Sequence, residues 1–200
     1  PLLSSAPRAR RALLSSSAPL ACALALIAAL SAAPAQAGVN TAFQGTPDVV
    51  IPGTATVTQT APLDTITITA PQAIINWTPD DHAASGTINF LPNGKSVVFQ
   101  SNANFTVLNR IIPTDVAGIP TLRQIALNGN ITSRITGLAS LPGGNVWFYS
   151  PGGILVGANS VINVGSLVLT SRDIDTTGGL FGSAGEIRFR DPPLAGAGNS

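Results

Sequence analysis

Charged side chains are scarce in this sequence: 10% of its residues are Asp, Glu, Lys or Arg, whereas 44% are hydrophobic. Globular domains usually carry about 25% charged residues, and these supply the outer faces of amphipathic helices. A chain with so little charge lacks the residues that a layer of solvated helices needs. Its polarity comes from Asn, Thr, Ser and Gly, which suit turns and exposed strand faces. The composition therefore favours an all-β fold, and its apolar content excludes a disordered chain.

Groups for acid–base and metal chemistry are also few. The sequence has one histidine, His82, which follows Asp80 and Asp81. A metal site usually needs three or four ligands, so we interpret this stretch as a solvated loop. A lone loop histidine without a cysteine beside it argues against hydrolytic catalysis. We predict no catalytic residue, no cofactor and no metal.

The first 37 residues have the parts of a secretory signal peptide. A basic stretch, Arg8–Arg11, precedes an apolar run from Pro19 to Ala33, and the small-x-small pattern of Ala35 and Ala37 follows. The run of 15 residues is shorter than the ~20 that a membrane-spanning helix requires. Cys22 is not expected to be a lipoprotein cysteine, because apolar residues continue well past it. We predict residues 1–37 as a signal peptide for the Sec machinery and residues 38–200 as the exported domain.

The exported part carries one lysine and six arginines against nine acidic residues, a net charge of −2. A nucleic-acid partner is therefore not expected, because such proteins need a basic surface. This part also has no cysteine, so disulfides cannot lock it in an oxidising compartment. That property suits a chain that must stay unfolded while it passes a second membrane.

Short apolar runs separated by turn residues predict many short strands. Residues 38–62 are rich in Thr, Pro and Gly and predict short edge strands or an irregular cap, and residues 112–122 predict a loop. Alternation with period two predicts half-buried strands elsewhere. The predicted strands lie at 64–70, 72–77, 87–90, 96–100 and 104–111, at three places within 123–150, and at 153–157, 160–165 and 166–171.

Two all-β architectures fit this pattern, a sandwich or barrel and a β-helix. A strand of three or four residues gains little from a two-stranded hairpin. In stacked parallel coils the same strand pairs above and below, and its inward side chains join one core. Asn and Gly at the corners tolerate the backbone of sharp bends. The pattern favours the β-helix.

Four segments resemble the N-terminal secretion domain of filamentous haemagglutinin-type exoproteins, the large partners of two-partner secretion in Gram-negative bacteria. The segments are residues 73–77, 107–111, 127–131 and 144–174, in the family's order and behind a signal peptide. The resemblance assigns six residues to its structural motifs: Asn76, Trp77, Asn109, Arg110, Asn163 and Gly165.

The resemblance implies a right-handed parallel β-helix with a β-rich N-terminal cap and no catalytic role. Its partner would be an outer-membrane β-barrel transporter with periplasmic POTRA domains, and the protein would be secreted or held at the cell surface after crossing the periplasm. Since a solenoid needs capped ends and the sequence shows no C-terminal cap, we expect a fragment of a longer exoprotein. Its further part would act on a host or bacterial cell surface, for example as an adhesin, cytolysin or toxin.

The family's Asn-Pro-Asn-Gly-Ile turn corresponds to Ser150, Pro151, Gly152, Gly153 and Ile154. Pro151 suits the first central position of a tight turn, Gly153 suits a positive φ, and the Ser150 hydroxyl is expected to cap the turn. The sequence departs from the family at Ser150 and Gly152, where Asn is usual. We predict transporter recognition by this turn and by an edge strand between Gly38 and Ala70 that adds to a POTRA sheet.

Other functions stay open at this stage, namely a β-helical polysaccharide-active enzyme or an autotransporter passenger. Arg172, Asp173 and Asp175 invite comparison with the acidic clusters that bind Ca²⁺ in β-helical lyases, although alternating polar residues on a strand explain them as well. We expect Trp77 and Trp147 to pack inside the fold and not to form an exposed ligand platform.

Overall fold

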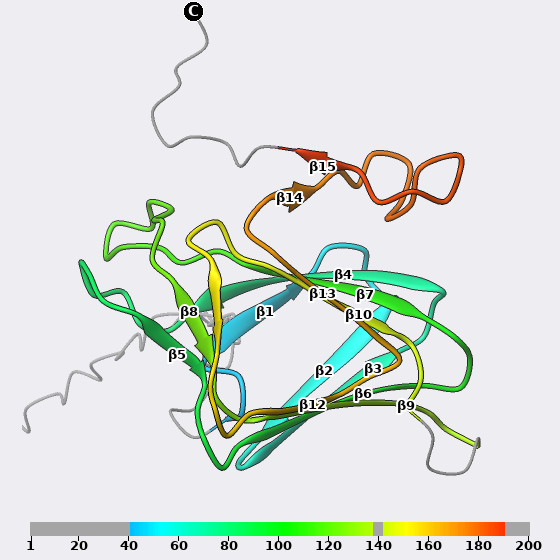
Figure 1. Cartoon of the computed structure of the whole chain (residues 1–200), viewed down its shortest axis with the longest axis horizontal. Helices are drawn as coiled ribbons and strands as arrows, with labels where there is room; N and C mark the ends of the chain where they lie inside the picture. The colour runs from blue at the N-terminus through cyan, green and yellow to red at the C-terminus, as the bar shows by residue number, and fades with distance from the viewer. Residues whose placement is uncertain (1–40, 138–141, 191–200) are drawn as a thin grey trace, which may run out of the picture. The chain divides into compact units, whose positions relative to one another are not determined.

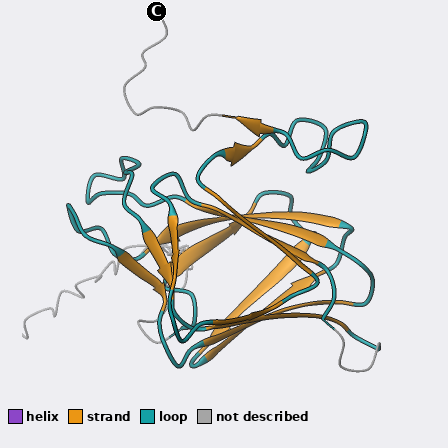
Figure 2. Cartoon of the chain, viewed as in Figure 1, coloured by secondary structure: helices purple, strands orange, loops and turns teal. Residues whose placement is uncertain are grey.

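A computed structural model describes residues 41–137 and 142–190, which all belong to one unit of the chain, Pro34–Ser200. The prediction of an all-β fold is confirmed for these residues, which form strands and loops and no helix (Figure 2). In the same ranges there is accordingly no helix with the length and hydropathy to cross a membrane. The predicted signal peptide, with Ala35 and Ala37, lies outside the described residues.

Three sheets contain thirteen of the strands (Figure 1). Sheet 1 contains, in spatial order, β1 (Gly45–Val49), β4 (Gln72–Pro79), β7 (Thr106–Ile111), β10 (Asn145–Tyr149) and β13 (Ser166–Thr170). Sheet 2 contains β5 (Ile88–Leu91), β8 (Ile125–Leu127) and β11 (Ile154–Val156). Sheet 3 contains β2 (Ala55–Thr60), β3 (Leu63–Ile68), β6 (Ser96–Ser101), β9 (Asn130–Ile135) and β12 (Val161–Asn163). A small antiparallel pair, β14 (Asp173–Ile174) and β15 (Phe189–Arg190), follows.

The chain visits the three sheets in the same order three times. Each visit, which we call a rung, places one strand in sheet 1, one in sheet 2 and one in sheet 3: β4-β5-β6, then β7-β8-β9, then β10-β11-β12. Equivalent strands of successive rungs pair in parallel, so Ile75, Asn109 and Phe148 stand in one row across sheet 1. The strands predicted from alternation are confirmed, and the 38–62 region supplies β1 and β2.

Inward side chains of the three sheets share one core. Part of this core is aromatic: the ring of Phe43 stacks on Phe90 at 4.8 Å and meets Trp77 edge-on at 4.9 Å. The prediction that Trp77 packs inside the fold is confirmed, since it is fully buried. Aliphatic rows such as Leu91 and Leu127 extend this core along the rungs.

The N-terminal end of the stack is closed. β1 pairs antiparallel with β4, and β2 pairs antiparallel with β3. Residues 41–44 cross this end, where the buried carboxylate of Asp64 accepts hydrogen bonds from the backbone N–H groups of Ala42 (3.0 Å) and Phe43 (2.8 Å). Burial raises the pKa of Asp64, although these hydrogen bonds oppose the shift.

At the opposite end, the strands β11, β12 and β13 are the last of their sheets within the described residues. Inward positions there are exposed: Val156 is 47% exposed, Leu167 38% and Leu169 37%. Their partners one rung earlier, Leu127, Val146 and Phe148, are fully buried. The described part of the chain therefore leaves this end of the core open.

A second, smaller apolar cluster lies on the outer face of sheet 1, under residues 171–190. The side chain of Trp147 meets Phe181 edge-on at 5.1 Å, so its predicted packing role is also confirmed. The backbone N–H of Leu180 donates to the side chain of Gln72 at 2.8 Å. We refer to residues 171–190 as the outer segment.

Candidate functional site

The three connections from sheet 1 to sheet 2 share one corner of the fold. Residues 80–87 join β4 to β5, residues 112–124 join β7 to β8, and residues 150–153 join β10 to β11. The first two project beyond β5 and β8 as long loops (Figure 1). This corner contains the turn that the sequence singles out for transporter recognition.

The 150–153 connection is a tight turn. The backbone N–H of Gly153 donates to the carbonyl oxygen of Ser150 at 3.0 Å, which places Pro151 at the first central position. Gly153 has a φ of 93°, a backbone conformation that glycine adopts without strain. The expectation that the Ser150 hydroxyl caps this turn is wrong. Among the residues that the structure describes, that buried hydroxyl has no hydrogen-bond partner, and the serine carbonyl makes the bond that closes the turn.

Gly152 is required by close packing. A Cβ atom at this position would stand 2.2 Å from the carbonyl oxygen of Arg123 and 2.4 Å from that of Leu122. Any side chain would therefore collide with the backbone of the 112–124 connection. An asparagine here would force that connection away from the turn.

The two long loops are joined by a charged pair. Arg123 is buried, and its Nη2 lies 2.9 Å from Oδ2 of Asp81. The same guanidinium donates to the carbonyl oxygens of Asp81 (2.9 Å) and Gly86 (3.0 Å). The hydrogen bond with Arg123 holds the pKa of Asp81 below its usual value.

His82 takes part in the same contact between loops. Its Nδ1 lies 3.2 Å from the carbonyl oxygen of Thr114. The side chain of Asp80 beside it is exposed, but surrounding protein atoms partly desolvate its carboxyl group and so raise its pKa. Within the ranges that the structure describes, no three His, Cys, Asp or Glu side chains come together as a possible metal site. The 80–82 stretch thus helps to join the 80–87 loop to the 112–124 loop.

Two of the motif residues form a bridge through the inner core. The indole N–H of Trp77 donates to Oδ1 of Asn109 at 3.1 Å, and Nδ2 of Asn109 donates to the carbonyl oxygen of Trp147 at 3.2 Å. Asn109 is fully buried, so these bonds satisfy a polar group that would otherwise be costly there. The bridge links the sheet 1 strands of all three rungs, which is a structural role.

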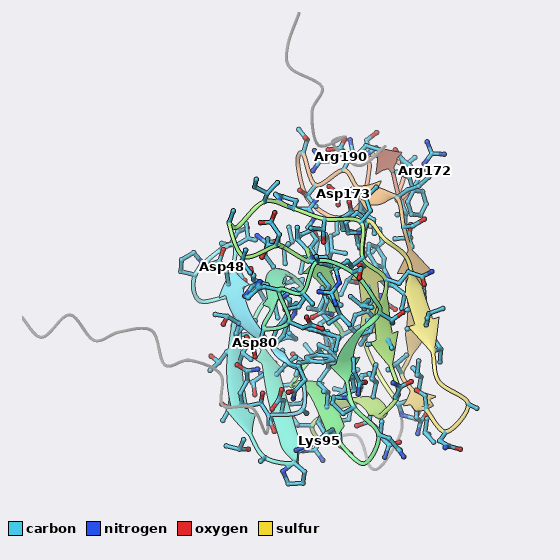
Figure 3. The ribbon with its side chains drawn as sticks, turned by 90° about the vertical axis from the view of Figure 1, so that its left-hand side faces the viewer. Asp48, Asp80, Lys95, Arg172, Asp173 and Arg190 are labelled. Atoms are coloured by element: carbon cyan, nitrogen blue, oxygen red, sulfur yellow. The ribbon has the colours of Figure 1, made fainter. Side chains whose placement is uncertain are left out.

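Arg110, next in the motif, points to the outer face and holds the outer segment. Its Nε lies 2.8 Å from Oδ1 of Asp173, and its Nη2 donates to the carbonyl oxygen of Ile174 at 2.7 Å. Arg190 donates to Oδ2 of the same carboxylate at 2.8 Å (Figure 3). Asn76 lies half-buried opposite Arg110 in the neighbouring strand.

This clamp gives the acidic residues of the outer segment a structural explanation. Asp173 is buried between two arginines, and Asp175 is 3.7 Å from Arg188 and accepts from the N–H of Thr177. Each of these two carboxylates therefore has an arginine as its partner. The sequence alone did not reveal the clamp, because Arg110 and Asp173 stand 63 residues apart.

The last two motif residues lie at the open end. Asn163 ends β12 and is exposed. Gly165 follows, and a Cβ atom there would stand 2.5 Å from the carbonyl oxygen of Gly144. Gly165 thus allows close stacking of two rungs, and the two residues do not meet the corner that carries the 150–153 turn.

The closed end offers a separate candidate, the outer edge of β2. Within the described residues β2 pairs with β3 alone, so its other edge is free. Thr54 and Thr69 share a ladder hydrogen bond, and bonded pairs alternate along an antiparallel ladder. The backbone groups of Val57 and Gln59 therefore point away from β3. β1 also stands at an edge, but it contains Pro47, which has no N–H to donate, and the charged Asp48.

Comparisons with known proteins do not place the chain in a family. No family model matches the sequence, and no curated protein matches it either. The resemblance to the secretion domain of haemagglutinin-type exoproteins therefore stays a prediction, as do the transporter and the export route that it implies.

Proposed function

We propose that this chain is the secretion-targeting region of an exported protein, recognised by an outer-membrane transporter with periplasmic POTRA domains. We further propose that its three sheets wind as a right-handed parallel β-helix with an N-terminal cap formed by β1 and β2. In this proposal the chain has no catalytic role, and it acts as an address that the transporter reads.

The parallel pairing of successive rungs supports the β-helical part of the proposal. Each rung places its strands in the same three sheets, and inward residues such as Ile88 and Ile125 stack in rows. A stack of this kind buries one continuous core without long-range hairpins. The antiparallel β1 and β2 close one end of that core, as a cap does.

The free edge of β2 is the observation that carries the recognition part. Natural edge strands are usually protected by charge, proline or a bulge. β2, with the sequence ATVTQT, has six residues without charge or proline, and within the described part of the chain no strand pairs with its backbone groups at Val57 and Gln59. An extended, uncharged edge of this length can pair with a strand of another sheet, which is how β-augmentation gives affinity.

Export of the protein into the culture medium, with and without its cognate transporter, tests the function. We expect export to stop when the transporter is deleted and to return when it is supplied again. Export that continues unchanged without the transporter would contradict the proposal and favour an autotransporter-like route.

A lysine on β2 tests the edge. Thr58 is exposed, so Thr58→Lys keeps the core intact but places a charge where a partner strand would approach. We expect binding to the purified POTRA domains to weaken about tenfold, because strand pairing would have to desolvate that charge. Asn130→Lys is the matched control, since Asn130 is also exposed but lies in β9, between β6 and β12. Equal binding by both variants would exclude β2 as the pairing edge.

A further inference from the structure

The 112–124 connection exposes three large aliphatic side chains. Val116 is 91% exposed, Leu122 66% and Ile119 56%, and the first two are the most exposed large hydrophobic residues of the described chain. Single exposed apolar residues are common on protein surfaces, but several on one segment mark an interaction site. Residues 112–124 form a loop between β7 and β8 and belong to no sheet, so these side chains do not extend the inner core.

The backbone of this segment is held in one shape. Oδ1 of Asp115 accepts hydrogen bonds from the N–H groups of Ala117 (2.8 Å) and Ile119 (2.9 Å), and the N–H of Asp115 donates to the carbonyl oxygen of Ile119 at 2.9 Å. Thr114 and Pro120 form a further antiparallel bridge. A segment that is ordered before binding loses little conformational entropy when a partner binds it.

The base of the segment is fixed as well. The ion pair between Arg123 and Asp81 ties it to the 80–87 loop, and its backbone at Leu122 and Arg123 packs directly on Gly152. Since Ser150 is fully buried in the turn, the 112–124 connection is the more accessible element of this corner. A partner that approaches the corner meets the aliphatic side chains before it meets the turn.

The charge pattern selects the kind of partner. Residues 112–124 contain no Lys, Trp or Tyr. Their two charged residues are engaged: the carboxylate of Asp115 accepts from backbone N–H groups, and Arg123 is buried and paired with Asp81. Segments that dock on membranes use basic residues to attract anionic lipids and aromatic residues at the interface. A segment that exposes aliphatic side chains but no lysine, tryptophan or tyrosine fits an apolar groove on a folded protein better than a lipid surface.

We infer that residues 112–124 form a preformed binding element that inserts Val116, Ile119 and Leu122 into an apolar groove of a protein partner. This inference rests on the proposed function for the partner's identity: the groove lies on the periplasmic domains of the transporter. The element is separate from the β2 edge, so the protein has two recognition surfaces, one that pairs backbone and one that inserts side chains.

The test replaces the three aliphatic side chains together, as Val116→Ser, Ile119→Ser and Leu122→Ser. All three are exposed, so the thermal unfolding of the variant should match that of the wild type. The control is Val161→Ser with Phe189→Ser, which removes apolar side chains that are 57% and 50% exposed from β12 and β15, outside both proposed recognition surfaces. Binding to the purified periplasmic domains is measured by calorimetry with the full chain.

We expect the triple variant to bind on the order of a hundredfold more weakly, because truncating each anchoring side chain usually costs about tenfold or more. The double control should stay within about twofold. Equal affinity of the triple variant and the wild type would overturn the inference while the transporter function stands. Binding of the wild type, but not of the triple variant, to phosphatidylcholine vesicles in place of the periplasmic domains would overturn it in favour of lipid.

The export assay distinguishes a failure of this inference from a failure of the proposed function. If the wild type does not bind the periplasmic domains but still needs the transporter for export, the inference fails and the proposed function survives. If export does not need the transporter, the proposed function fails, and with it the partner named here.

Discussion

The two ends of the rung stack are built from the same kind of strand but differ in what covers them. At the N-terminal end, Phe43 and the antiparallel strands β1 and β2 close the core, and Phe43 is fully buried. At the other end, inward residues such as Val156 and Leu169 are 47% and 37% exposed. The difference arises from neighbours and not from residue type, since Leu127, paired with Val156, is completely buried.

This contrast shows where stability is concentrated. A side chain gains its full burial energy only when strands lie on both sides of its rung. The closed end adds the buried aromatic ring of Phe43. It also adds the buried carboxylate of Asp64, which accepts hydrogen bonds from backbone N–H groups, so a polar group also contributes to stability there. We therefore expect equal truncations to cost more at the closed end than at the open end.

Truncating Phe43 should have the largest effect on the free energy of unfolding. Phe43→Ala removes a ring that contacts Phe90 and Trp77, and should lower the free energy of unfolding by about 3–5 kcal/mol. Leu169→Ala at the open end should cost about 1 kcal/mol, because that side chain is 37% exposed. Urea unfolding of the purified protein measures both values. A cost for Leu169→Ala as large as that for Phe43→Ala would mean that the open end is covered in solution.

The polar contact at the closed end should give the next largest effect. Asp64→Asn keeps one acceptor oxygen but replaces the other with an NH₂ group, so a buried N–H of Ala42 or Phe43 loses its partner. The expected loss is about 1–3 kcal/mol in the free energy of unfolding. Asp48→Asn in β1 serves as the control, because Asp48 is exposed and should change stability by less than about 0.5 kcal/mol. Similar losses in both variants would contradict the role of Asp64 in closing this end.

The ends also differ in how far the sequence predicts them. Alternation of Thr and Ile over residues 64–70 predicts a half-buried strand, and β3 spans Leu63–Ile68. Period-two alternation is a local signal that reports which face of a strand is buried. It does not report whether the next rung exists, so the exposure of Leu167 and Leu169 could not be derived from their own segment.

The candidate site was predictable in part for the same reason. The positive φ of Gly153 follows from local turn chemistry and could be predicted. The need for Gly152 could not, because it depends on the backbone of Leu122 and Arg123, about thirty residues earlier in the chain. The clamp of Arg110 on Asp173 is likewise a contact between distant segments, and alternating polarity alone does not select that pair.

The smallest expected effect is a dependence of stability on pH that arises at the closed end. Burial raises the pKa of Asp64 in the folded protein above its value in the unfolded chain, about 3.9. The folded state therefore holds this proton more tightly than the unfolded state does. The stabilisation from this linkage is fully present below pH ~3.9 and is lost as the pH rises through the folded pKa.

The difference in unfolding free energy between the wild type and Asp64→Asn isolates this contribution, because other carboxyl groups titrate equally in both proteins. Urea unfolding at a series of pH values from about 3 to 7 should show this difference decreasing as the pH rises, and then levelling off. A difference that grows with pH would mean that the two backbone N–H groups of Ala42 and Phe43 outweigh burial and lower the pKa of Asp64. In that case the carboxylate would close this end mainly as a charged acceptor, and raising the pH would strengthen the contrast between the two ends.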